Sequence, residues 1–85
     1  MVKKMKLKTE EGKLYVGDKE VLKGWESFSG WYWFATELNN DGIHFGLVQG
    51  FEDELGYFSE MELESMRNKV WEIKKIDLPH AGRRY

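Results

Sequence analysis

The strongest hydrophobic pattern in the chain is the aromatic-rich stretch from Trp31 to Leu38. In an extended strand, alternation divides this stretch into one face with Trp31, Trp33, Ala35 and Glu37 and another with Tyr32, Phe34, Thr36 and Leu38. Both faces are largely apolar, which is typical of a central strand covered on its two sides. The pattern therefore predicts that Trp33 and Phe34 are substantially buried on opposite faces of one strand.

A hairpin is predicted after this strand. The run Asn39-Asn40-Asp41-Gly42 supplies residues that tolerate the positive φ angles of a tight turn. Residues 43–49 then return as the partner strand, with three apolar side chains on one face. Gly46 and Gly50 leave space on the opposite face, which favours an aromatic ring packed across the sheet there.

The residues before Trp31 predict a small meander. Lys3 to Lys8 alternates and indicates a half-buried strand. After a turn over 9–12, Lys13 to Val16 and Glu20 to Lys23 are two short strands joined at Gly17-Asp18. Gly24 to Gly30 is expected to be irregular, with Trp25 and Phe28 folded back on the core as a lid or, alternatively, exposed for a partner.

The residues after Gly50 predict one short helix. Residues 51–58 are expected to connect the hairpin to a capping box, Ser59-Glu60-Met61-Glu62, with the helix starting at Glu60. Leu63 and Met66 form its buried stripe, and Asn68 is suitable for a left-handed cap. Val70 to Leu78 is interpreted as a last strand, with a longer helix as the alternative. Pro79 ends this element, and residues 79–85 are expected to form a loose tail.

These elements predict an α+β fold in a single domain over residues 1–85. We expect a mostly antiparallel sheet of about five or six strands with one short helix. The chain has 85 residues and no cysteine, which excludes disulfides, thiolate zinc sites and cysteine nucleophiles and fits a reducing cytoplasm. No apolar run approaches the roughly 18 residues needed to span a bilayer, so no membrane partner is expected.

Charge is strongly segregated along the chain. Residues 1–23 carry a net charge of +3, residues 24–66 carry −9 without any Lys or Arg, and residues 67–85 carry +4. One interpretation is that the basic ends pair with the acidic middle in the folded protein. The other is an acidic face that attracts a cation or a basic protein partner.

The densest acidic run is Glu52-Asp53-Glu54, between Gly50 and Gly56. Calcium takes six to eight oxygen ligands in irregular geometry, so this run predicts a weak Ca²⁺ site, with Glu37 and Asp41 as contributors. The spacing is not that of an EF-hand, and a solvated acidic loop before a helix is the alternative. The sequence thus predicts a small non-catalytic binding module with an acidic face.

Two further functions are alternatives to a cation site. An acidic inhibitor or adaptor, or a nucleic-acid mimic, would engage a basic protein partner through the same face. Binding of nucleic acid itself is not expected, because the aromatic residues lie in the stretch without bases. An enzyme with a dispersed site has little support, since His44 and His80 have no nucleophile near them in sequence. A deep polar pocket around His44 would favour the enzyme, and a flat acidic patch would favour the adaptor.

Four motifs also carry a resemblance to a known family. They are Trp31-x-Trp33 with Thr36-Glu37, Phe45-Gly46-Leu47-Val48-x-Gly50, Glu54-Leu55-Gly56-Tyr57-Phe58-Ser59 and Glu62-Leu63-Glu64. The pattern resembles a family of small uncharacterised proteins, a domain of unknown function, found in bacteria and archaea and often on plasmids and phages. The resemblance covers about residues 30–64, and Glu60 stands where the family usually has an apolar residue. It implies a shared core fold and assigns no activity.

Overall fold

A computed structural model describes residues 6–84 and contains, over that range, two antiparallel sheets and one short α-helix. The smaller sheet has the order β1-β2-β3, with β1 Leu7–Glu10, β2 Lys13–Val16 and β3 Lys19–Glu20. The larger has the order β7-β6-β5-β4-β8, with β4 Lys23–Ser27, β5 Tyr32–Glu37, β6 Ile43–Gln49, β7 Asp53–Ser59 and β8 Val70–Glu72. Helix α1 spans Glu60–Ser65, and a 3₁₀ helix spans Leu78–His80. The mostly antiparallel α+β class is confirmed, although the strands divide between two sheets and exceed the expected number.

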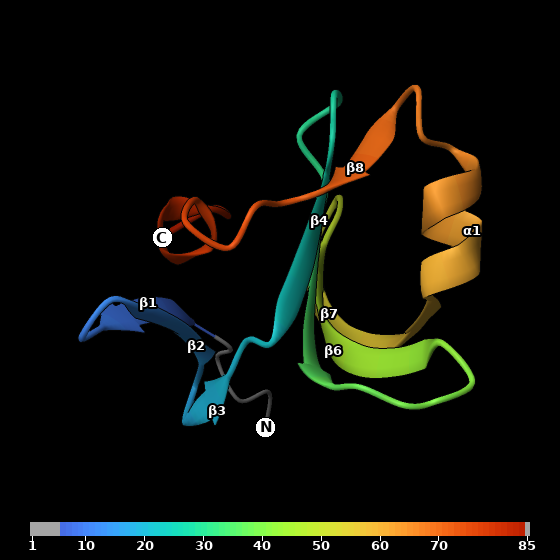
Figure 1. The fold of residues 1–85 in the computed structure, drawn as a ribbon. Coiled ribbons are helices and arrows are strands. Elements are labelled where there is room, and N and C mark those ends of the chain that lie inside the picture. The colour runs from blue at the N-terminus through green and yellow to red at the C-terminus, as the bar shows by residue number, and fades with distance from the viewer. Residues whose placement is uncertain (1–5, 85) are drawn as a thin grey trace.

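The large sheet lies between two layers (Figure 1). Helix α1 covers one face, called here the α1 face, while β1–β3 and the C-terminal segment cover the other, called the β1 face. Strand β5 is the middle strand of five, as its two apolar faces predicted. Within the described range, the chain contains no helix with the length and apolar character required to cross a bilayer.

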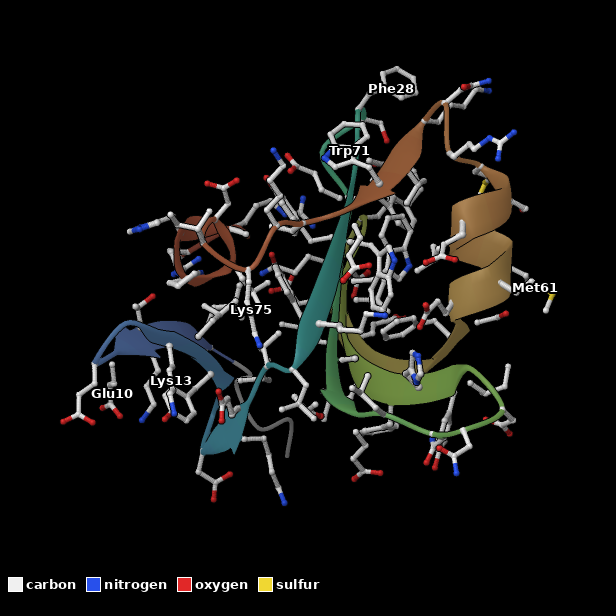
Figure 2. All side chains as sticks on the ribbon, in the orientation of Figure 1. Glu10, Lys13, Phe28, Met61, Trp71 and Lys75 are labelled. Atoms are coloured by element: carbon white, nitrogen blue, oxygen red, sulfur yellow. The ribbon has the colours of Figure 1, made fainter. Side chains whose placement is uncertain are left out.

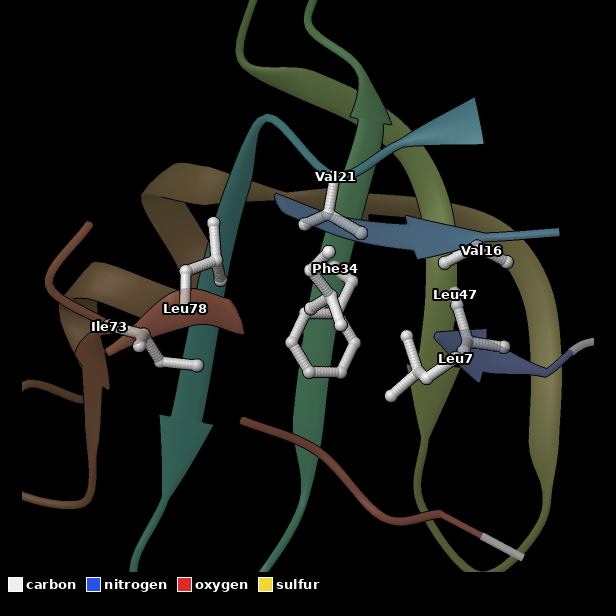
Figure 3. Close-up of a cluster of buried hydrophobic side chains, with 8 residues drawn as sticks. Leu7, Val16, Val21, Phe34, Leu47, Ile73 and Leu78 are labelled. Carbon is white, nitrogen blue, oxygen red and sulfur yellow. The ribbon is translucent and has the colours of Figure 1, made fainter. Parts of the chain in front are cut away.

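Each face of the large sheet has its own core. On the β1 face, Phe34 is fully buried among apolar side chains from both sheets and from the C-terminal segment (Figure 3): Leu7, Leu14, Val16, Val21, Leu47, Ile73 and Leu78. On the α1 face, Trp25 packs with Ala35, Phe58, Leu63 and Val70, and Trp33 lies partly buried beside them. The opposite-face prediction is confirmed for both residues, but only Phe34 is fully buried.

The predicted turns and cap are largely present. Gly17 and Gly42 both have positive φ, at 62° and 80°, in the two hairpins that the sequence indicated. Ser59 caps α1 by accepting a hydrogen bond from the Glu62 amide at 3.2 Å. Strands β2 and β6 match their expected bounds, whereas β1 begins at Leu7 within the described range. The part of the predicted first strand over residues 3–5 lies outside that range.

Two segments expected to be irregular are strands. Residues 23–27 form β4, between β5 and β8, and an added Cβ at its Gly24 would lie 2.7 Å from a Leu78 methyl group, which would have to move. Trp25 is therefore part of the sheet rather than a lid, while Phe28 in the following turn projects outward (Figure 2) and is 72% exposed. Residues 53–59 form β7, an edge strand whose exposed acid and glycine hid the strand pattern.

The C-terminal third also differs from expectation. Helix α1 ends at a Met66 cap, and Met66 is 45% exposed, so it does not belong to the buried stripe of the helix. Among the described residues the only non-glycine with positive φ is Glu11, so Asn68 is not a left-handed cap. Strand β8 ends at Glu72, and Pro79 lies inside the 3₁₀ helix instead of ending a strand.

The expected loose tail is packed through Arg84. Gln49 exchanges two hydrogen bonds with the Arg83 backbone, at 2.7 and 2.9 Å, and Gly82 lies against Leu7 and Phe34. A buried glutamine anchored the segment, which composition alone did not indicate.

Candidate binding surface

Three aromatic side chains on the α1 face form a cluster that is partly exposed to solvent. Trp31 and Trp33 have ring centroids 6.0 Å apart, and Phe51 meets the Trp31 ring edge-to-face at 5.2 Å. Phe51 is 94% exposed, while the two tryptophans are partly exposed. We call Trp31, Trp33 and Phe51 the aromatic platform.

Two glycines shape this part of the sheet. An added Cβ at Gly50 would lie 2.5 Å from the Trp31 ring, so the predicted aromatic ring over Gly50 is confirmed. A different contact explains the glycine at position 46, because an added Cβ there would meet the Phe34 carbonyl oxygen at 1.7 Å. Backbone rather than an aromatic ring occupies the space at Gly46, next to a register shift in β5.

Acidic side chains border the aromatic platform. Trp33 pairs with Val48, and Val48 pairs with Glu54, so the three form a row across β5, β6 and β7 on the α1 face. Glu52 is exposed in the turn directly after Phe51. The platform is thus apolar in its middle and carries carboxylates on its β7 side.

Asp53 points to the opposite face from Glu54. It pairs with Gln49, accepts a hydrogen bond from the Gln49 Nε2 at 2.9 Å, and lies 3.8 Å from an Arg83 nitrogen. Alternation along β7 therefore separates the three consecutive acids: Asp53 belongs to the β1 face and is already engaged, whereas Glu52 and Glu54 are exposed.

The two distant residues expected to help bind calcium lie away from this turn. Asp41 lies in the turn before β6 and accepts a hydrogen bond from the Ile43 amide at 3.0 Å. Ile43 is six residues along β6 from Gln49, the partner of Asp53, which corresponds to about 20 Å. Glu37 lies in the row of Phe45 and Tyr57, about 13 Å from Asp53 along the strand. Across residues 6–84, no three His, Asp or Glu side chains are grouped as a metal site would require.

A second polar cluster surrounds His44 under the start of α1. The His44 Nδ1 accepts a hydrogen bond from the Asn39 amide at 3.1 Å, so the proton resides on Nε2, which donates to Glu60 at 2.7 Å. Lys23 also donates to Glu60, at 3.1 Å, and its ammonium lies 5.4 Å from the Trp25 ring centroid. The His44 ring is buried and stacks on Trp25. Both ring nitrogens of His44 are thus used within the fold.

These contacts shift the pKa values of two carboxyl groups in opposite directions. The hydrogen bond from His44, aided by Lys23, lowers the pKa of Glu60 below its ordinary value despite partial burial. Desolvation, together with the nearby Glu60 charge, raises the pKa of Glu64 one helical turn later. The cluster borders a cleft of about 620 Å³ between α1 and the turn that joins β5 to β6. Its lining includes His44, Glu60 and Glu64.

Comparisons with models of protein families, with curated proteins and with solved structures found no match. The resemblance over residues 30–64 therefore stays a prediction. Sequence reasoning located the acidic run but missed the aromatic platform beside it. The available signal was Phe51, a large aromatic residue placed between Gly50 and three acids, where a strand core would not put one.

Proposed function

We propose that this protein is a small non-catalytic binding module whose aromatic platform and its acidic border engage a basic surface on a partner protein. The observation that carries the proposal is Phe51, which is 94% exposed and meets the Trp31 ring edge-to-face at 5.2 Å. Exposed aromatic residues beside carboxylates suit arginine and lysine side chains, which stack on rings and pair with acids. Aromatic anchors surrounded by polar residues are also the usual composition of protein interfaces.

Charge supports a basic partner over a nucleic acid. Glu52 and Glu54 border the platform, and phosphates would meet repulsion there. Arg83, a base of the C-terminal segment, donates to the Gly50 carbonyl at 2.5 Å and lies near Asp53, so it is engaged within the fold. A nucleic-acid mimic, which would bind the basic site of a nucleic-acid-binding protein, is one form of the same proposal.

The cleft beside His44 is the feature that favours the enzyme alternative. Its support is limited, because His44 would need to break a hydrogen bond to act at either ring nitrogen. The aromatic platform needs no rearrangement before a partner can reach it. A binding module is therefore the function that the geometry supports best.

The test uses a hexaarginine peptide as the probe and tryptophan fluorescence as the readout. Phe51→Ala should weaken binding about two- to five-fold, the equivalent of an exposed cation–π contact of about 0.5–1 kcal/mol. Phe51→Ala should leave the melting temperature unchanged, because the side chain is almost fully exposed. Glu52→Gln with Glu54→Gln should also weaken binding and should reduce its dependence on salt.

A charge-matched control separates the surface from the net charge. Asp18→Asn with Glu20→Gln removes two exposed acids from the small sheet and should leave affinity within error of the parent protein. If this control weakened peptide binding as much as the Glu52 and Glu54 pair, only the overall charge would matter. The proposal would then be wrong.

A further inference from the structure

Strand β7 is an edge strand whose outer backbone groups can be assigned from the register. The Glu60 amide donates to the Gly42 carbonyl, and the Gly50 amide donates to the Glu52 carbonyl. Both bonds fix the alternation of the antiparallel ladder, so Glu54, Gly56 and Phe58 bond to β6. Asp53, Leu55, Tyr57 and Ser59 consequently direct their N–H and C=O groups away from the sheet.

This edge is long and regular. Strand β7 has seven residues, and its pairing with β6 runs without a register shift from Ile43 to Gln49. The opposite edge, β8, has only three residues. Leu55 is 40% exposed and Tyr57 69%, and both lie on the β1 face beside the outward amides. Proteins usually protect such edges, because unpaired amides and apolar side chains recruit another strand.

Charge decides which strand can pair there. An antiparallel pairing of two copies centred on Gly56 would set the Glu52 and Glu54 region of one copy against the first turn of α1 in the other. That turn carries Glu60 and Glu62, so a second copy meets like charge. A basic strand meets opposite charge at both ends of β7. The acids thus disfavour self-pairing in this register and favour a basic strand from another protein.

We propose that the outer edge of β7 accepts an extended basic segment of a partner protein as an additional antiparallel strand. The partner alternates apolar and basic residues: its apolar side chains lie on the β1 face beside Leu55 and Tyr57, and its basic side chains lie on the α1 face beside Glu54. The mode is β-strand addition, in which backbone bonds supply affinity and alternate side chains supply specificity. The basic nature of the partner rests on the proposed function, whereas the backbone geometry of the edge does not.

The experiment uses the peptide acetyl-Lys-Val-Lys-Val-Lys-Val-Lys-amide and amide hydrogen exchange of the full chain. In the free protein, the amides of Leu55 and Tyr57 should exchange fast and those of Gly56 and Phe58 slowly. Saturating peptide should slow exchange at Leu55 and Tyr57 at least tenfold. Unchanged exchange at these two amides would overturn the proposal.

Two N-methylated peptides provide the matched control. In the antiparallel arrangement the valines lie opposite Leu55 and Tyr57 and donate the bonding amides, so N-methylation of the valines should abolish protection. N-methylation of the lysines blocks only outward amides and should leave protection intact. Equal binding by both peptides would overturn strand addition. Slow exchange that depends on protein concentration without peptide, together with dimer in sedimentation, would assign the edge to a second copy and would also overturn it.

Phe51→Ala separates this inference from the proposed function. If the variant keeps peptide protection at Leu55 and Tyr57 but hexaarginine binding is not weakened, the edge proposal stands and the aromatic platform fails. If hexaarginine binding weakens and the peptide gives no protection, the platform stands and the edge proposal fails.

Discussion

Two glycines that face each other across β6 and β7 should respond very differently to the same substitution. Gly46 and Gly56 are direct partners in the ladder. An added Cβ at Gly46 would lie 1.7 Å from the Phe34 carbonyl oxygen, although real Cβ atoms essentially never come closer than 3.0 Å. At Gly56 an added Cβ would meet nothing within 4 Å. Gly46→Ala must therefore displace β5 by more than an ångström, while Gly56→Ala displaces nothing.

The expected destabilisation follows from what β5 would lose. Moving the Phe34 backbone weakens about two ladder hydrogen bonds, each contributing about 0.5–1.5 kcal/mol. It also disturbs the fully buried Phe34 ring, where overpacking strain is typically about 1–3 kcal/mol. Gly46→Ala should thus destabilise the fold by about 2–6 kcal/mol. Gly56→Ala should be neutral or should stabilise by up to about 1 kcal/mol through the unfolded chain.

Urea unfolding followed by tryptophan fluorescence measures both variants. A loss of about 2 kcal/mol in the free energy of unfolding corresponds to a fall in melting temperature of roughly 8–16 °C in a domain of this size. If Gly46→Ala and Gly56→Ala unfolded at the same urea concentration, the close approach of β5 to β6 at Gly46 would be wrong. The assignment of β5 as the middle strand would then need revision.

Two other predictions concern acidic residues. The lowered pKa of Glu60 means that its ionised form stabilises the fold above its ordinary value of 4.5 and that this stability is lost as the pH falls below it. The melting temperature should fall less steeply between pH 5 and pH 3 for Glu60→Gln than for the parent protein. It should fall more steeply for Glu64→Gln, because the raised pKa of Glu64 has the opposite effect on stability. Equal slopes for the variants and the parent would contradict both predictions. If the acidic run binds calcium, the affinity should be weak, about 10⁻⁴–10⁻³ M. Glu52→Gln with Glu54→Gln should remove any Ca²⁺-induced rise in melting temperature and Asp53→Asn should not, with NaCl at matched ionic strength as the control for screening.

The elements that sequence reasoning located are those in which local and tertiary preferences agree. Strand β6 and the cap at Ser59 carry alternation and a capping box, and both were found at their observed bounds. Strand β5 was located because both of its faces are apolar. In these segments the nearest neighbours in sequence contain enough information to specify the backbone.

The segments that were missed depend on distant partners. Gly24 suggests a loop until Leu78, more than fifty residues later, is seen to fill its side-chain space. The C-terminal segment looks like a basic tail, but Gln49 binds the Arg83 backbone. Strand β7 was hidden because an edge strand tolerates charge on a solvated side.

For a related reason, the sequence predicted the acidic part of the candidate surface and not its aromatic part. The acidic run stood out in sequence, but which of its members share a face depends on the strand assignment that was missed. Because residues 53–59 form a strand, the side chains of Asp53 and Glu54 lie on opposite faces of the sheet. The cation hypothesis weakens with that separation, and the aromatic residue beside the run becomes the more informative feature. Phe51 directly precedes the acidic run and contacts the Trp31 ring, so the run lies beside an aromatic cluster.

The charge segregation is only partly resolved inside the fold. Residues 24–66, all of which the structure describes, contain nine acids. Of these nine, Asp53 and Glu60 form ion pairs with Lys or Arg, and the other seven do not. Like charges without a partner in a small domain repel one another and reduce its stability. A basic partner would remove this repulsion on binding, so part of the binding energy would come from the protein's own unfavourable charge distribution. Asp41 and Glu26 accept hydrogen bonds within the fold, so the carboxylates that the proposed partner would contact are those beside the aromatic platform, Glu52 and Glu54.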